Sequence, residues 1–180
     1  MMSRLLFAKR IFRQGFIMLI LTANIGCDQV SKHVVRQQMD YFEKIHLIDH
    51  HLTLTKVENT GAFLSLGNDM NPRLKVWLLT ILPLVILLGA IVFVFARKDL
   101  SLITLTGLCF FIGGGAGNIF DRVLFGSVTD FLHIDFGLFQ TGVFNMADVS
   151  IMVGTGLLLW GTSGSKVATV PESQATDLNN

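Results

Sequence analysis

The sequence predicts a membrane protein of the all-α class, a bundle of four transmembrane helices with a small extracytoplasmic β-sheet. Of its 180 residues, 51% are hydrophobic and only 15% are charged. The mean hydropathy is +0.58, well outside the balance of a soluble domain. A spanning helix needs about 20 mostly apolar residues. Four segments fit this requirement, at residues 12–32, 76–96, 100–120 and 144–164.

The four predicted spans differ in the charges they carry. Residues 76–96 and 100–120 contain no charged residue. The first span meets Asp28 near its end, and the last carries Asp148 one turn inside its start. A charge at membrane depth is costly and persists where it is paired, hydrated or used, so both acids are candidates for function. Pro83 lies within the second span, where we expect a mild kink.

Two longer connections, residues 33–74 and 122–143, contain strand patterns. In the first, HLTLTKVENTGAFLSLG alternates apolar and polar residues before an Asn-Thr-Gly turn signal, which predicts one or two short strands. Residues 127–144 alternate similarly and either pair with these strands or form a flap. An even number of spans puts both connections on one side. We expect one domain over residues 1–165 and a disordered cytoplasmic tail over residues 166–180.

Basic residues predict the orientation in the membrane. They precede the first span and fill the short turn between the second and third, at Arg4, Lys9, Arg10, Arg13, Arg97 and Lys98. By the positive-inside rule both termini are cytoplasmic, and most acidic residues then fall near the outer face. The N-terminus imitates a lipoprotein signal, but Asn24 stands where such signals carry an aliphatic residue. We therefore interpret residues 1–33 as a retained anchor.

The composition argues against several classes of function. The net charge is +1 and no basic stripe stands out, so we expect no nucleic-acid partner. Cys27 and Cys109 lie in apolar runs, where a thiol is usually packing material. No zinc-binding motif is formed by His46, His50, His51 and His133, and we therefore expect no metal.

Two groups of polar residues lie near the outer ends of the predicted helices. Asp28 and Lys32 stand four apart, which allows an ion pair that either closes the helix end or shapes the rim of a site. Asn118, Asp121 and Arg122 share one helix face by the same spacing rule. The glycine run before them, GGGAG, lacks the Gly-Lys-Ser/Thr ending of a phosphate-binding loop. It instead favours close helix packing.

Two further acids are predicted to meet at the membrane surface. Asp130 lies in the extended stretch VTDF, while Asn145 and Asp148 lie three apart at the start of the last span. Two carboxylates in a site of low dielectric share a proton, so one acts as a base and the other as an acid. This is what water-driven cleavage of an amide requires. The alternative is that Asp148 only caps or pairs within the bundle while Asp130 is solvated.

The order of five motifs gives the sequence a family resemblance. DQVSK, ENTGAF, GGGAGNIFDR, VTDF and FNMAD resemble the lipoprotein signal peptidase family, also called signal peptidase II, over almost the whole chain. The family more usually has GGALGN where this chain has GGGAGN, which leaves the polar positions in place. The resemblance implies that Asp130 and Asp148 are the catalytic aspartates. It assigns the remaining polar positions around the site to Asp28, Lys32, Asn59, Asn118, Asp121, Arg122 and Asn145.

The resemblance also implies a function. Members are aspartic endopeptidases of the bacterial inner membrane that remove the signal peptide from diacylglyceryl-modified prolipoproteins, just before the lipidated cysteine. We therefore expect a lipid-modified prolipoprotein and membrane lipids as partners, no cofactor, a monomer and an active site near the outer face. A proton relay or small transporter is the alternative from another class, but it requires polar residues across the membrane depth.

Overall fold

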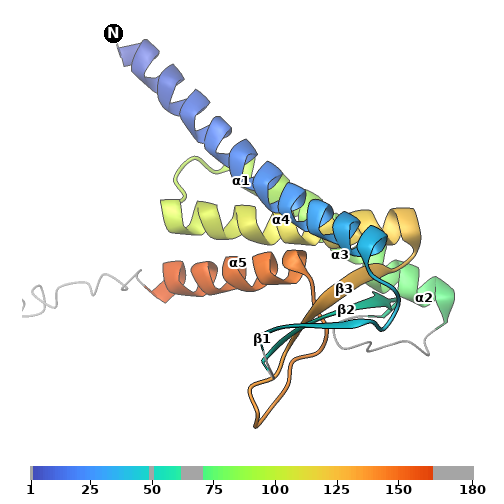
Figure 1. The fold of residues 1–180 in the computed structure, drawn as a ribbon. Helices are drawn as coiled ribbons and strands as arrows, with labels where there is room; N and C mark the ends of the chain where they lie inside the picture. The colour runs from blue at the N-terminus through green and yellow to red at the C-terminus, as the bar shows by residue number, and fades with distance from the viewer. Residues whose placement is uncertain (1, 49–50, 62–70, 164–180) are drawn as a thin grey trace, which may run out of the picture.

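The computed structural model describes residues 2–48, 51–61 and 71–163, and the predicted tail 166–180 lies outside the described residues. The helices and strands follow in the order α1 (Met2–Gln38), β1 (Lys44–Ile48), β2 (Leu52–Asn59), α2 (Pro72–Val76), a π-helical segment (Trp77–Ile81), α3 (Leu82–Ala96), α4 (Leu102–Phe125), β3 (Val128–Ile134) and α5 (Met146–Ser163). The helices lie together, and the small sheet covers one end of them (Figure 1). The predicted class, helical with a small sheet, is therefore confirmed in outline.

The helices differ from the predicted spans in length. Within the described ranges, two helices are long and apolar enough to cross a membrane, Pro72–Ala96 and Leu102–Phe125. The other two predicted spans, 12–32 and 144–164, lie within α1 and α5. α1 is much longer than predicted because a helix needs only backbone hydrogen bonds to continue, so its basic start and polar end do not interrupt it. Four crossings therefore stay a prediction.

Pro83 lies at the start of α3, directly after the π-helical segment. Proline has no N–H to donate to the preceding turn and its ring crowds the carbonyl found there. A π-helical turn shifts the hydrogen-bond register by one residue, which accommodates such an interruption without ending the helix. This change of register lies next to Pro83, where the sequence predicts a mild kink, and the kink itself stays a prediction.

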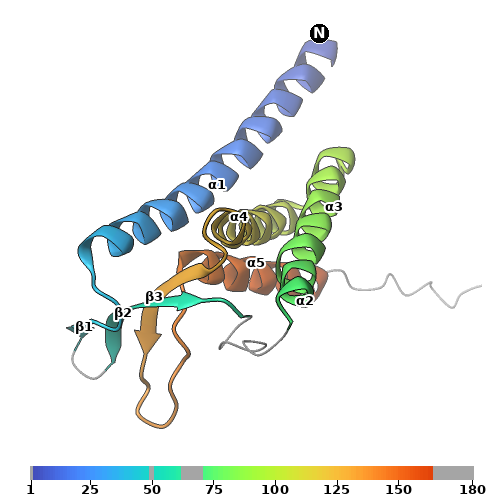
Figure 2. The same ribbon diagram turned by 90° about the vertical axis from the view of Figure 1, so that its right-hand side faces the viewer.

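The sheet is antiparallel with the strand order β1-β2-β3. β3 pairs with β2, with Val57 opposite Asp130 and Asn59 opposite Val128. The two long connections therefore form one sheet, which settles the choice between strand pairing and a flap. A bulge between Leu54 and Val57 shifts the register just before this pairing. The sheet lies beside the end of α1 and the start of α5 (Figure 2).

The sheet is fixed to the C-terminal end of α1. Val35 and Met39 pack against Phe131 of β3 in a small buried cluster. Lys56 of β2 donates hydrogen bonds from Nζ to the carbonyl oxygens of Arg36 at 3.1 Å and Met39 at 2.9 Å. A cation here satisfies acceptors that lack partners within the helix and complements the negative end of its dipole. These contacts set the position of β3 relative to the helices.

Glycines allow α4 and α5 to pack closely, as the sequence predicted. A Cβ on Gly114 would collide with the carbonyl oxygen of Ala147 and lie 3.0 Å from the side chain of Ser150. Further along, a Cβ on Gly154 would lie 2.7 Å from the carbonyl oxygen of Gly107. Of the two cysteines predicted to be packing material, Cys109 is buried in the apolar core, whereas Cys27 is exposed on α1. The sequence did not distinguish the two, because composition does not show which face of a helix the other helices cover.

Candidate active site

Asp130 and Asp148 line the same small cavity, although they come from different elements. Asp130 is on β3, and Asp148 is in the first turn of α5. The cavity has a volume of about 50 Å³. Most of its lining side chains are polar or charged, and the lining residues are Asn59, Asn118, Arg122, Val128, Asp130, Val143, Asn145 and Asp148.

A reciprocal cap at the start of α5 holds Asp148. The backbone N–H of Asp148 donates to Oδ1 of Asn145 at 3.0 Å, and the backbone N–H of Asn145 donates to Oδ2 of Asp148 at 3.1 Å. This is the capping-box arrangement, in which residues three apart satisfy each other's unpaired N–H groups. Oδ1 of Asp148 accepts a further hydrogen bond of 2.8 Å from the amide of Asn118 on α4. Both carboxylate oxygens are therefore oriented by donors.

Asn145 also connects the two aspartates. Its Nδ2 donates to Oδ1 of Asp130 at 2.6 Å and to Oδ1 of Asn118 at 3.1 Å. The second oxygen of Asp130 accepts a hydrogen bond of 2.9 Å from the amide of Asn59 on β2. A single side chain thus caps α5 and joins Asp130 to Asp148. The alternative in which Asp148 only caps the helix is correct about the cap and wrong about Asp130, whose exposed fraction is 3%.

The environment of Asp130 favours its neutral form. Burial raises the pKa of its carboxyl from 3.8 to about 6 against the lowering effect of the hydrogen bond from Asn59, and the nearby charge of Asp148 raises it further. Hydrogen bonding from Asn145 and the positive charge of Lys32 act in the opposite direction. A carboxyl with a pKa this far above its usual value can hold a proton near neutral pH, as acid–base chemistry requires.

Behind the cavity lies a buried cluster of charges centred on Lys32. Its Nζ lies 2.9 Å from Oδ2 of Asp28 and 3.0 Å from Oδ2 of Asp121, and it donates a hydrogen bond of 3.0 Å to Oδ1 of Asn118. Lys32, Asp28 and Asp121 have exposed fractions of 0%. The predicted pair of Asp28 and Lys32 is therefore present, but it is enclosed rather than at a rim. Through Asn118 it supports Asp148.

Asp28 has a second role that spacing did not reveal. Its Oδ1 accepts a hydrogen bond of 2.9 Å from the backbone N–H of Ala147, in the first turn of α5. A carboxylate at this position satisfies an unpaired donor and complements the positive end of the helix dipole. The start of α5, which carries Asp148, is thereby fixed to α1.

The remaining predicted residues also lie here. Arg122 donates from Nη2 to the carbonyl oxygen of Gly61 at 3.1 Å, and the backbone N–H of Gly61 donates to Oδ1 of Asn59 at 2.9 Å. The structure thus divides the nine predicted site positions between the cavity and the charge cluster. No group of three or more His, Cys, Asp or Glu residues within the described ranges could hold a metal ion.

A second cation, which was not predicted from the sequence, lies beside the cluster. Nη2 of Arg36 lies 2.9 Å from Oδ1 of Asp121, and Nε of Arg36 donates to the hydroxyl of Thr129 at 2.8 Å. The same hydroxyl donates to Oε1 of Glu58 at 2.7 Å. Arg36 follows Lys32 by four residues, so the same helical spacing that paired Asp28 with Lys32 would have found it. Thr129 and Glu58 become neighbours only through the register of β2 with β3.

The sequence profile of the family described as signal peptidase (SPase) II matches residues 20–163, which hold all of these positions. The chain belongs to the signal peptidase II family. It is 33% identical to the lipoprotein signal peptidase of Streptococcus pneumoniae over 82% of this chain and 92% of that protein. The lipoprotein signal peptidase of Solibacter usitatus is 35% identical over 73% of this chain and 80% of its own length.

Two solved structures share the fold. One bacterial membrane enzyme, solved by the in meso method at 2.3 Å resolution, has a TM-score of 0.73 and 28% identity, covering 87% of this chain and 94% of that one. A second, solved in the same way at 1.9 Å resolution, has a TM-score of 0.72 and 25% identity, covering 84% and 95% of the respective chains. Membership in the signal peptidase II family and the two long apolar helices both indicate a membrane protein.

Proposed function

We propose that this chain is a membrane aspartic endopeptidase that removes the signal peptide from diacylglyceryl-modified prolipoproteins, cutting just before the lipidated cysteine. Its family membership makes it a peptidase that cleaves lipoprotein signal peptides. The aspartic mechanism rests on one observation, that Asp130 and Asp148 line one cavity and bond to the same residue, Asn145. The proposed pair requires no cofactor.

The two aspartates divide the proton chemistry. Asp148 acts as the base and takes a proton from a water molecule, whose oxygen attacks the scissile carbonyl carbon. Asp130, whose pKa is raised to about 6, carries a proton and donates a hydrogen bond to the oxygen that becomes negative. The tetrahedral intermediate then collapses as the C–N bond breaks. Asp148 returns its proton to the leaving nitrogen, which frees the signal peptide.

Neighbouring side chains keep this pair in register. Asn118 and Asn145 each donate to one oxygen of an aspartate and constrain its rotation. Arg122 lines the same cavity and is available to polar groups of the substrate backbone. The roles of Asp28, Lys32 and Asp121 are to hold α1, α4 and the start of α5 together, so these residues position the site without contacting the substrate.

The membrane arrangement belongs to the same proposal. We place four crossings along α1, the helix Pro72–Ala96, α4 and α5, with both termini in the cytoplasm. The sheet and the aspartates then lie near the outer face of the inner membrane. The apolar outer surfaces of the helices leave the lipid chains of the substrate in the bilayer while its peptide enters the polar cavity. The protein acts as a monomer.

A cleavage assay with matched substitutions tests the proposal. The purified protein is incubated with a lipidated and a non-lipidated form of one precursor. We expect only the lipidated form to be cut, and Asp130→Asn and Asp148→Asn each to lower the rate by about 10²- to 10⁴-fold. Asp40→Asn is the matched control, because Asp40 is exposed just beyond the end of α1.

Two results of this assay would overturn the proposal. Wild-type cleavage by either site variant, in protein that unfolds at the wild-type temperature, excludes the aspartic mechanism. Equal cleavage of both precursors removes the requirement for lipid. Loss of activity in the Asp40 variant would instead show that the assay reports a general effect of charge.

A further inference from the structure

A large hollow lies at the opposite end of the bundle from the aspartates, between the start of α1 and the end of α3. Its volume is about 680 Å³. Four cations and two phenyl rings dominate its lining, which consists of Phe7, Lys9, Arg10, Arg13, Gln14, Phe95 and Lys98. No acidic side chain lines it within the described parts of the chain. We call these seven residues the basic pocket.

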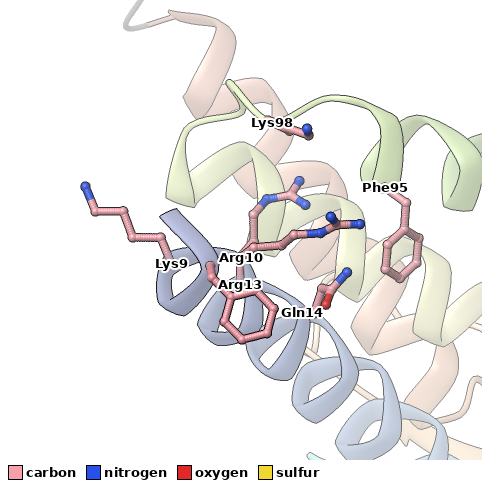
Figure 3. A pocket seen from close by; sticks show the side chains of 7 residues that line it. Lys9, Arg10, Arg13, Gln14, Phe95 and Lys98 are labelled. Atoms are coloured by element: carbon pink, nitrogen blue, oxygen red, sulfur yellow. The ribbon is translucent and has the colours of Figure 1, made fainter. Parts of the chain in front are cut away.

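The cations of the basic pocket converge from two elements. Figure 3 shows Arg10 and Arg13 extending from α1 toward the space in front of Phe95 and Lys98, whereas Lys9 points away at the edge. Arg13 is partly occupied, because its Nη2 donates to the carbonyl oxygens of Val94 and Arg97, each at 2.7 Å. It thereby satisfies acceptors at the end of α3. Arg10 and Lys98 carry the charge that remains for a ligand.

The acidic residue that follows Lys98 in the chain is already paired. Asp99 accepts hydrogen bonds of 3.1 Å from both Nε and Nη2 of Arg97, just outside the pocket. The cations of the basic pocket are like charges held close together, and they repel one another unless an anion lies between them. A flat basic surface would satisfy the positive-inside rule equally well. A concave site with converging cations is a more specific arrangement and requires an explanation of its own.

The place of the pocket along the helices identifies the kind of anion. Arg13 precedes Asp28 by 15 positions of one helix, or about 22 Å, so the pocket and the active site are separated by most of a hydrocarbon core. Apolar side chains around the pocket are exposed, with Phe12 at 78% and Phe7 at 66%. A ligand that satisfies both surfaces has a negative head and apolar chains. Anionic phospholipids have this chemistry, and basic pockets between membrane helices suit their head groups.

We propose that the basic pocket binds the phosphate of an anionic phospholipid, whose acyl chains lie along the exposed apolar faces of α1 and α3. Arg10 and Lys98 contact the phosphate, while Arg13 holds the end of α3 in place. A lipid bound there would fill the space between α1 and α3, which are connected at this end by the hydrogen bonds of Arg13. The site is separate from the peptidase centre, and its occupancy is measured without any cleavage step.

Lipid binding to the purified full chain in an uncharged detergent tests the proposal. Native mass spectrometry compares phosphatidylglycerol with phosphatidylcholine of the same acyl chains. The test variant is Arg10→Gln with Lys98→Gln, which leaves Arg13 in place. The control is Arg73→Gln with Lys75→Gln, which removes the same two residue types from α2, outside the basic pocket. Thermal unfolding verifies that both variants fold.

We expect the wild type to prefer phosphatidylglycerol and the pocket variant to bind it about 30-fold more weakly, or about fivefold for each cation removed. The control variant keeps the wild-type affinity. An unchanged affinity in the pocket variant overturns the proposal, as does equal binding of the two lipids. Inorganic phosphate at the same concentration as the phosphatidylglycerol forms a further arm of the experiment. If it displaces the lipid at this equal concentration, the acyl chains add nothing to binding and the lipid assignment is wrong.

Discussion

The side-chain amide of Asn145 donates a hydrogen bond of 2.6 Å to Oδ1 of Asp130. The same residue caps α5 through its other side-chain atom, so the position of β3 and the start of the helix depend on one side chain. Substitution of Asp130 or Asp148 alone does not test this coupling. Substitutions around the two aspartates can separate the proton chemistry from the contacts that position them.

The first prediction concerns the pH dependence of cleavage. Burial raises the pKa of Asp130 to about 6, and the proposed mechanism requires this carboxyl to be protonated in the free enzyme. The value of kcat/KM should therefore fall as pH rises above about 6, by up to tenfold for each pH unit. Steady-state rates across the pH range measure this limb. A kcat/KM that instead rises through pH 6 would reverse the roles of the two aspartates.

The substrate should move this titration. A bound peptide excludes water from around Asp130, and desolvation disfavours the charged form of a carboxyl. The corresponding fall in kcat should therefore occur at a higher pH than the fall in kcat/KM. Identical limbs in the two profiles would indicate that Asp130 stays hydrated in the complex.

The second prediction separates the two roles of Asn145. In Asn145→Ser, the hydroxyl still accepts from the N–H of Asp148, but the donor to Asp130 is lost. Because that hydrogen bond lowers the pKa of Asp130, its loss should move the kcat/KM limb to higher pH. The maximal rate should fall by about 2- to 10-fold, because the protonated carboxyl of Asp130 loses a donor that orients it and a hydrogen bond between neutral groups contributes about 0.5–1.5 kcal/mol.

Asn71 offers the matched control for this variant. It caps α2 through a hydrogen bond of 2.9 Å from the N–H of Arg73 to its Oδ1. Asn71→Ser therefore changes the same residue type at another helix start. We expect an unchanged pH profile in this variant. A shifted limb in both variants would mean that the substitutions act through stability, and no shift in Asn145→Ser would remove Asn145 from the control of Asp130.

The charge cluster leads to the third prediction. Lys32→Met would leave Asp28 and Asp121 enclosed without the cation that lies within 3.0 Å of each. Breaking a buried pair by removing one partner typically costs about 3–5 kcal/mol. For a chain of this size, the unfolding temperature should fall by roughly 10 °C. Lys44→Met on the exposed β1 is the control and should change the unfolding temperature little.

A rescue variant distinguishes charge from packing in this cluster. Asp28→Asn combined with Lys32→Met removes one of the stranded carboxylates, while Arg36 still neutralises Asp121 at 2.9 Å. The double variant should therefore unfold at a higher temperature than Lys32→Met alone. If it is less stable than the single variant, the cluster depends on the hydrogen bond from Ala147 to Asp28 more than on charge balance.

Local spacing rules predicted part of the candidate site, and the family resemblance assigned the catalytic roles to Asp130 and Asp148. Asp28 with Lys32 and Asn145 with Asp148 each lie one helical turn apart, so periodicity alone places them together. The link from Asn145 to Asp130 follows from the pairing of β3 with β2 and the packing of β3 on α1. No local rule contains those contacts. Asn59 was identified through the family resemblance alone, for the same reason.

Element limits were harder to predict than element types. Hydropathy locates the part of a helix that a membrane could cover, and it does not detect where the helix itself begins or ends. α1 therefore continues to Gln38, through Asp28 and Lys32, whose charges are satisfied inside the bundle. The sequence left open whether residues 127–144 pair with the earlier strands or form a flap, because an alternating pattern predicts a strand and does not identify the strand next to it.

The last prediction tests the close approach of α4 and α5. A Cβ on Gly114 would collide with the carbonyl oxygen of Ala147, which directly precedes Asp148 in α5. Backbone cannot move aside as a flexible side chain can, so Gly114→Ala should separate the helices at the active site. We expect a loss of about 1–3 kcal/mol in stability together with a fall in cleavage rate.

The control is Gly156→Ala, which lies on α5 and has nothing within 4 Å of the added carbon. It should keep full activity and gain up to about 1 kcal/mol from the higher helix propensity of alanine. Normal cleavage by Gly114→Ala would show that the start of α5 tolerates displacement, and that Asn145 and Asp28 can hold Asp148 without close helix packing.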